Sequence, residues 1–250
     1  MGKTYFASDF HLGIDGNLTS LERERIVVNW LSEIQKDIEA IYLLGDVFDY
    51  WFEYQNVVPK GFTRLLGKIA SLTDQGAEVH WIVGNHDMWT FGYLEKELGI
   101  NIHKKPVLQS INGKKFFLAH GDGLGNGDFS YKILKSIFTS KFCQFLFSLT
   151  PPALGLPLMK YYSRKSRIHK LEDEKKEDEK DQALIDYCEK LIKEQPIDYF
   201  VMGHRHWPKM VQLSNGKSQY INLGDWMHHF TYAVLDENGR MELKTYPTPS

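Results

Sequence analysis

Features that mark a specialised class of protein are scarce in this chain of 250 residues. Two cysteines, Cys143 and Cys188, are too few for a disulfide framework, so we expect a reducing, cytoplasmic setting. No apolar run approaches the roughly 18 residues of a membrane-spanning helix, and no secretory signal is recognisable. The formal net charge of −2 gives no field that would attract nucleic acid, which we exclude as a partner.

The first half of the chain does carry a hydrophobic pattern, in which strand-like and helix-like segments alternate. Thr19 and Glu22 have the spacing of a capping box at the start of the first predicted helix. The predicted order is strand 3–9, helix 19–38, strand 40–46, helix 60–76, strand 78–85 and helix 90–100. This order indicates an α/β protein with a largely parallel sheet covered by helices.

Hairpins are expected later in the chain, because Asn-Gly pairs that favour tight turns separate short apolar segments. These pairs are Asn112-Gly113, Asn215-Gly216 and Asn238-Gly239. An antiparallel second half is therefore expected to follow the parallel first half.

Residues 124–195 interrupt this pattern. The stretch begins with apolar and aromatic segments of helical character, is broken at Pro151-Pro152, and continues into densely charged sequence. We predict a core formed by residues 1–123 and 196–250, with residues 124–195 as a helical insert. Two interpretations of its apolar part remain open. It is either buried against the core, or it acts as an acyl-binding lid or a membrane-surface helix.

Five predicted strands end in side chains that can bind metal ions. They are Asp9 and His11, Asp46 and Asp49, Asn85 with His86 and Asp87, His120 and Asp122, and His204 with His206. The carboxyl ends of parallel strands meet at one edge of a sheet, and residues two apart on an extended chain point to the same side. Imidazole, carboxylate and amide ligands without a thiolate suit Mn, Fe or Zn.

A single histidine or aspartate after a strand is more often an ordinary turn residue. Five such clusters in one chain instead indicate a centre with two divalent ions. Ions about 3.5–4 Å apart can clamp the oxygens of a phosphoryl group during hydrolysis. Asp46 is the natural bridging ligand, because its strand is the middle one of the three predicted parallel strands.

The five clusters resemble the motifs D-x-H, G-D, G-N-H-D, H-G-D and G-H-x-H of the calcineurin-like metallophosphoesterase superfamily. The resemblance implies a four-layer α/β/β/α sandwich of two mixed sheets with a helical lid insert. It also implies one metal ion on Asp9, His11, Asp46 and His206, and another on Asp46, Asn85, His120 and His204. Mn²⁺ is the preferred ion, and Fe or Zn would also fit this ligand set.

A narrower similarity, carried by "SDFHLG", "GDVFDYW" and "NLGDW", is to the UDP-2,3-diacylglucosamine hydrolases of lipid A synthesis. It implies a UDP-linked diacyl sugar as substrate, cleavage to UMP and diacylglucosamine 1-phosphate, and peripheral contact with the cytoplasmic face of the inner membrane. His86 stands where that family carries Arg, and Arg167 where it usually carries Asn. The implied substrate-binding residues are Asn85, His86, Asp128, Ser163, Arg167, Lys170 and His204.

Within this resemblance, the expected catalytic residues are Asn85, His86 and Asp87. Asn85 would bind metal and contact the phosphate, His86 would donate a proton or bind phosphate, and Asp87 would orient the neighbouring imidazole. Two alternatives remain open: a general phosphodiesterase or phosphatase acting on soluble phosphoesters, and a lipid-binding scaffold on the same fold.

Overall fold

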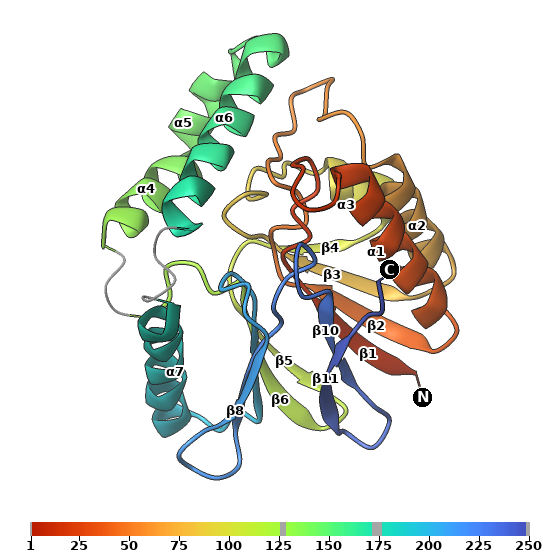
Figure 1. Ribbon diagram of the computed structural model, residues 1–250, viewed down its shortest axis with the longest axis vertical. Helices are drawn as coiled ribbons and strands as arrows, with labels where there is room; N and C mark the ends of the chain where they lie inside the picture. Colours follow the sequence, from red (N-terminus) through yellow and green to blue (C-terminus); the bar gives the residue numbers. More distant parts are fainter. Residues whose placement is uncertain (1, 126–128, 172–176, 249–250) are drawn as a thin grey trace.

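Two mixed β-sheets lie face to face in the computed structural model, with helices on their outer sides (Figure 1). The structure describes residues 2–125, 129–171 and 177–248. The first sheet has the strand order β11-β10-β1-β2-β3-β4. Its strands are β1 (Lys3–Ala7), β2 (Ile38–Leu43), β3 (Glu78–Ile82), β4 (Asn101–His103), β10 (Thr231–Leu235) and β11 (Met241–Thr245). β1, β2 and β3 are parallel, as expected, and β4, which was not predicted, continues the parallel order. β10 and β11 add an antiparallel edge.

The second sheet has the order β5-β6-β7-β9-β8. Its strands are β5 (Val107–Ile111), β6 (Lys114–Leu118), β7 (Tyr199–Met202), β8 (Lys209–Gln212) and β9 (Gln219–Asn222). The expectation of an antiparallel second half is wrong in part, because β6 pairs parallel with β7, and β7 parallel with β9. Parallel neighbours need a long crossover connection. The helical segment between β6 and β7 is such a connection.

Three apolar layers hold the sandwich together. Alternation along the strands sends Phe6 and Tyr42 into the layer between the sheets, while Tyr5 and Ile41 face the helices on the other side. Phe6 on β1 stacks on Phe116 of β6 with ring centroids 5.6 Å apart, so one aromatic pair joins the two sheets. The expected four-layer α/β/β/α arrangement is confirmed.

The helices divide into two outer layers and a group above the sheets. α1 (Ser20–Ile34), α2 (Thr63–Asp74) and α3 (Tyr93–Leu98) cover the first sheet. α7 (Glu177–Glu194) covers the second sheet and buries Leu184 and Cys188 against it. The predicted capping box is confirmed at α1, where the Thr19 side chain accepts from the Glu22 amide and the Glu22 side chain accepts from the Thr19 amide.

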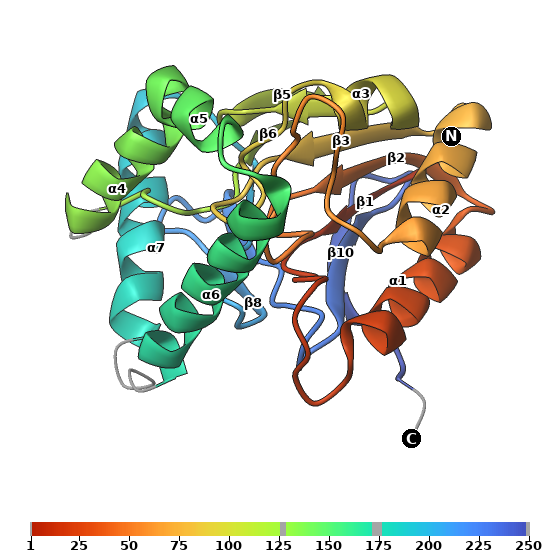
Figure 2. The ribbon, with the colours of Figure 1, turned by 90° about the horizontal axis from the view of Figure 1, so that it is seen from above.

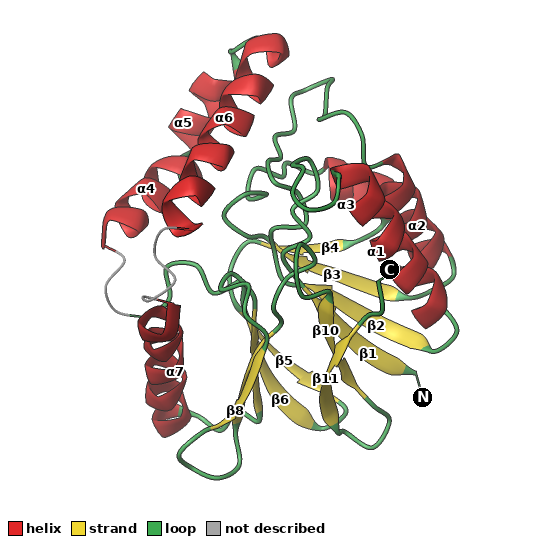
Figure 3. Cartoon of the chain, viewed as in Figure 1, coloured by secondary structure: helices red, strands yellow, loops and turns green. Residues whose placement is uncertain are grey.

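α4 (Phe129–Thr139), α5 (Lys141–Ser148) and α6 (Pro152–Leu171) form the third group, called here the lid helices. They lie together on one side of the sandwich, beyond the loops that follow the strands (Figures 2 and 3). Phe147, Leu156 and Met159 pack on a core cluster of Phe52, Tyr54 and Trp89. Among the described residues, no helix combines the length and apolar character needed to cross a membrane. The division into core and insert stays a prediction, and α7 within the predicted insert packs as a layer of the core.

Candidate metal centre

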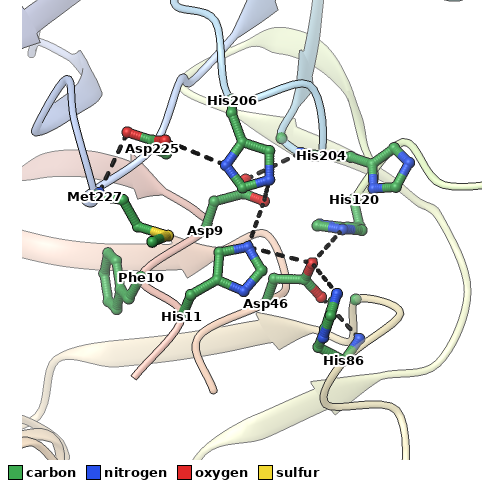
Figure 4. Close-up of polar contacts among 12 residues, drawn as sticks. Asp9, Phe10, His11, Asp46, His86, His120, His204, His206, Asp225 and Met227 are labelled. Atoms are coloured by element: carbon green, nitrogen blue, oxygen red, sulfur yellow. Dashed lines mark hydrogen bonds and ion pairs between the residues drawn. The ribbon is translucent and has the colours of Figure 1, made fainter. Parts of the chain in front are cut away.

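The five predicted clusters meet at one site. Each follows the carboxyl end of a strand, with Asp9 and His11 after β1, Asp46 after β2, Asn85 after β3, His120 after β6, and His204 and His206 after β7. Figure 4 shows the side chains from both sheets pointing toward one another. Parallel strands deliver their ends to the same edge, so the clusters after β1, β2 and β3 were expected to meet. The parallel pairing of β6 with β7, which was not expected, brings His120, His204 and His206 to the same place.

Two groups of ligand atoms share the site, and Asp46 stands between them. Asp9, His11 and His206 form one group, and Asp46, His120 and His204 form another, each with its ligand atoms within 4.8 Å of one another. Asp46 Oδ2 lies 3.6 Å from His11 Nε2 and 3.3 Å from His120 Nε2. One carboxylate oxygen therefore faces a histidine of either group, as a bridging ligand would.

Unusual backbone conformation accompanies these side chains. Eight non-glycine residues of the described chain have positive φ, and five of them are predicted ligands. The five are Asp9, His11, Asp46, His204 and His206, with φ between 45° and 70°. Such conformations cost free energy in L-residues, and they persist where the surrounding structure enforces them, most often at functional sites.

Glycines allow the strand ends to approach so closely. A Cβ on Gly84 would collide with the Asp46 carboxylate, and one on Gly203 would collide with Asp9 and Ser8. Only a residue without a side chain fits beside these carboxylates. The glycines of the G-N-H-D and G-H-x-H motifs are thus part of the packing of the site.

Buried charge dominates the electrostatics. Burial raises the pKa of Asp9. Burial would also raise the pKa of Asp46, but the charges of His120 and His86 outweigh it and hold the pKa well below its usual range. Burial lowers the pKa of His120, yet Asp46 and Asp9 together raise it to about 10. Carboxylates so close together favour positive charge in the space between them.

The donor set fits a divalent cation. Asp9 Oδ1 is buried and accepts no hydrogen bond from the described residues, although the Nε2 atoms of His11 and His206 lie 3.6 and 3.7 Å away. A buried carboxylate oxygen surrounded by imidazole nitrogens at these distances is suited to coordination. Asn85 Oδ1 joins the other group, 3.3 Å from His120 Nε2.

Outer partners hold the imidazoles in orientation. His11 Nδ1 lies 3.4 Å from Asp49 Oδ1, and His206 Nδ1 lies 3.2 Å from Asp225 Oδ2. His120 Nδ1 donates to the Leu44 carbonyl at 2.7 Å. Such contacts set which ring nitrogen faces a metal ion. Asp225 was not predicted as a site residue, although it follows β9 in a Gly-Asp pair like that of Asp46.

Arg23 is a second residue that the sequence did not identify. Its side chain lies on the buried face of α1 and is 1% exposed. The guanidinium donates to the carbonyls of Phe10 at 3.0 Å, His11 at 2.7 Å, Ile14 at 2.6 Å and Leu18 at 3.1 Å. The available signal was an arginine within the apolar stripe of an amphipathic helix.

The predicted catalytic residues have distinct surroundings. His86 Nε2 lies 4.0 Å from Asp46 Oδ2, and His86 also forms a group with His11 and Asp46 that could hold an ion. Asp87 accepts from the backbone amides of Gly84 at 2.7 Å and Val47 at 2.8 Å. The carboxylate of Asp87 thus joins the two loops that carry Asp46 and Asn85. Its expected role in orienting an imidazole stays a prediction.

Of the residues predicted from the insert, Ser163 reaches the site. Its hydroxyl donates to Asp49 Oδ2 at 2.6 Å and lies 3.1 Å from His86 Nδ1. Arg167 and Lys170 continue the backbone of α6, and their side chains are outside what the structure describes. Asp128 lies outside the described residues.

Comparison with known proteins agrees with this geometry. A model of the calcineurin-like phosphoesterase family matches residues 2–208. A UDP-2,3-diacylglucosamine hydrolase from Porphyromonas gingivalis is 37% identical, with 94% of each chain covered. One from Vibrio parahaemolyticus is 25% identical, with 98% of each chain covered.

A solved structure supports the fold. An archaeal phosphodiesterase superimposes with a TM-score of 0.50 at 15% identity, covering 98% of this chain and 99% of that one. The family match spans all five motif clusters. It accounts for the convergence of carboxylates and histidines at the strand ends. The chain therefore belongs to the calcineurin-like phosphoesterase family, and it is a metal-dependent hydrolase.

Proposed function

We propose that the protein hydrolyses the pyrophosphate of UDP-2,3-diacylglucosamine to UMP and 2,3-diacylglucosamine 1-phosphate, as a step of lipid A synthesis in the cytoplasm. The observation that carries the proposal is Asp46, which lies between histidines of two groups of metal ligands. The lid helices reach the same site through Ser163. The relatives named for this substrate align over nearly the whole chain, lid segment included, which supports the same substrate here.

Each group of side chains has a role in this reaction. Two divalent ions, preferably Mn²⁺, would supply an activated water molecule and neutralise phosphate charge. Asp9, His11, Asp46 and His206 would hold one ion, and Asp46, Asn85, His120 and His204 the other. Asn85 and His204 would also contact the substrate phosphate. Asp87 keeps the loops of Asp46 and Asn85 in register through its two backbone contacts. Water adds to one phosphorus, and the bond from that phosphorus to the bridging oxygen breaks.

The lid helices provide a surface for the acyl chains. Phe142, Phe145, Leu149 and Leu154 are all more than half exposed, and Phe142 is 68% exposed. Exposed apolar side chains in such number on adjacent helices mark a binding surface. We assign this surface to the acyl chains of the substrate and to the cytoplasmic surface of the membrane from which they come.

Competing substrates separate this proposal from a general phosphodiesterase. We expect release of UMP from UDP-2,3-diacylglucosamine, with a kcat/KM well above that for bis-p-nitrophenyl phosphate. The double variant Phe142→Ser/Phe145→Ser should lose activity on the lipid substrate and binding to anionic phospholipid vesicles, because it removes apolar contacts. Turnover of the small ester alone would establish the general phosphodiesterase. If neither compound is hydrolysed with Mn²⁺ present, the result would favour a lipid-binding scaffold protein on the same fold.

His86→Ala should lower kcat at least tenfold, a loss of about 1.4 kcal/mol of transition-state stabilisation. His86 Nδ1 lies 2.8 Å from the Asp49 carbonyl, which can only accept, so this nitrogen carries a proton. Nε2 lies 4.0 Å from Asp46 Oδ2 and so faces the metal ligands. With substrate bound there, an imidazolium at this position would donate to the leaving oxygen.

Steady-state kinetics and metal analysis together test the role of His86. His80→Ala is the matched control, because His80 lies on β3, the strand that precedes His86, and contacts His103 away from the metal centre. Unchanged turnover in His86→Ala would assign His86 to packing. A lower metal content in that variant would instead identify His86 as a ligand.

A further inference from the structure

Trp207 differs from every other tryptophan of the chain. It is 59% exposed, whereas Trp30, Trp51, Trp81, Trp89 and Trp226 are at most 8% exposed. Exposure of so large an apolar side chain forgoes the free energy that its burial would contribute. Its position in the fold is equally unusual, because it directly follows the ligand His206 and its Cα is therefore about 3.8 Å from that of His206.

Contacts continue from the metal centre to the indole ring. His206 Nδ1 lies 3.2 Å from Asp225 Oδ2, and Asp225 Oδ1 lies 3.3 Å from His229 Nδ1. The His229 ring meets the Trp207 ring edge to face, with centroids 5.0 Å apart and planes at 78°. The indole is therefore the outer member of a cluster that begins at a metal ligand.

Contacts of the following residues anchor the backbone at Trp207. β8 begins two residues later, at Lys209, and Lys209 pairs with Asp181 at 2.9 Å. Pro208 packs so closely on Gly224 that a Cβ there would lie 3.0 Å from the proline ring. An aromatic ring held in place and open to solvent binds a flat partner at little cost in conformational entropy.

The two sides of the metal centre differ in what they can bind. His86 contacts Ser163 of the lid helices, and His206 contacts Asp225. Figure 4 shows His86 and His206 on opposite sides of Asp9, His11 and Asp46. A pyrophosphate laid along the line from His86 to His206 would have one end near α6 of the lid helices and the other near Trp207.

We propose that Trp207 is the platform on which the nucleobase of the substrate stacks. This inference rests on the proposed function, since it assigns the lid to the diacyl sugar and the Trp207 side to the uridine. Stacking between a base and an aromatic side chain is strong and needs no particular base-edge hydrogen bonds. It would hold the nucleotide while the pyrophosphate lies at the metal ligands.

Competitive inhibition separates the base from the rest of the nucleotide. UMP and ribose 5-phosphate share the sugar phosphate, and only UMP carries a base. With bis-p-nitrophenyl phosphate as the reporter substrate, we expect UMP to inhibit wild-type protein more strongly than ribose 5-phosphate does. Trp207→Ala and Trp207→Leu should each raise the inhibition constant of UMP about tenfold relative to that of ribose 5-phosphate. Trp207→Phe should keep the wild-type ratio, because phenylalanine retains an aromatic face.

Trp207→Leu is the decisive variant, since leucine keeps an apolar side chain of substantial size without a π-face. A wild-type ratio in Trp207→Leu would overturn the proposal. Unchanged ratios in all three variants, together with weaker binding to anionic phospholipid vesicles, would assign Trp207 to the membrane surface and also overturn it. The ratio of the two inhibition constants does not depend on turnover of the lipid substrate. If UMP inhibits the wild-type protein more strongly than ribose 5-phosphate but UDP-2,3-diacylglucosamine is not hydrolysed, the nucleobase subsite would stand and the proposed substrate would be wrong.

Discussion

Asp46→Asn is expected to lower kcat by about 1000-fold or more, equivalent to roughly 4 kcal/mol of transition-state stabilisation. Asp46 Oδ2 faces histidines of both ligand groups, and Asp46 Oδ1 accepts from the His86 amide at 2.9 Å. Asparagine has nearly the same shape and can still accept from that amide. It lacks the negative charge that lets one side chain hold two cations. The variant should therefore fold but bind less than two equivalents of metal.

Three measurements on Asp46→Asn test this result: kcat with saturating Mn²⁺, bound metal by elemental analysis, and thermal unfolding. Asp74→Asn is the matched control, because Asp74 is an exposed residue at the end of α2. Near-normal kcat in Asp46→Asn with full metal content would refute the bridging role. The thermal scan would reveal a variant that is unfolded at the assay temperature, and it thereby distinguishes loss of the fold from loss of catalysis.

Arg23→Ala should lower the free energy of unfolding by about 3–5 kcal/mol. Four backbone carbonyls accept from the buried guanidinium, and alanine would leave them without this donor in a place that water reaches poorly. Two of the four belong to Phe10 and His11, in the segment that presents the first metal ligands, Asp9 and His11, both with positive φ. We therefore expect weaker metal binding as well. Arg23→Lys should recover only part of both losses, because an ammonium lacks the planar fork of donors.

Glu24→Gln separates the effect on metal binding from a general loss of stability. Glu24 is also buried on α1, but its carboxylate accepts from the amides of Arg64 and Leu65 at the start of α2, away from the ligand loop. The Glu24→Gln variant should unfold at lower denaturant concentration than the wild-type protein and still bind metal normally. Urea unfolding and calorimetric metal titration measure the two effects. A loss below about 1 kcal/mol in Arg23→Ala would contradict the role given to the guanidinium.

Local patterns predicted much of the fold and most of the metal centre. Each ligand is encoded beside the strand that carries it, so the five motifs could be read one at a time. Three of the motifs also contain the glycine that permits close approach, at Gly45, Gly84 and Gly203. The parallel pairing of β6 with β7 was missed, because Asn-Gly turns are a signal of adjacent hairpins only. What joins β6 to β7 is the long helical segment, and the pairing depends on where that segment returns the chain.

The sequence by itself determined which side chains can bind metal, the order of the first strands and helices, and the cap of α1. These follow from periodicity and from turn chemistry, which act over a few residues. Only the tertiary structure decided which residues from elsewhere meet the ligands. Ser163 contacts Asp49 across 114 positions of the chain, and Arg23 reaches from a helix into the ligand loop. No local pattern specifies such contacts, because they depend on how separately formed elements pack together. The same packing leaves Trp207 exposed while the other five tryptophans are buried.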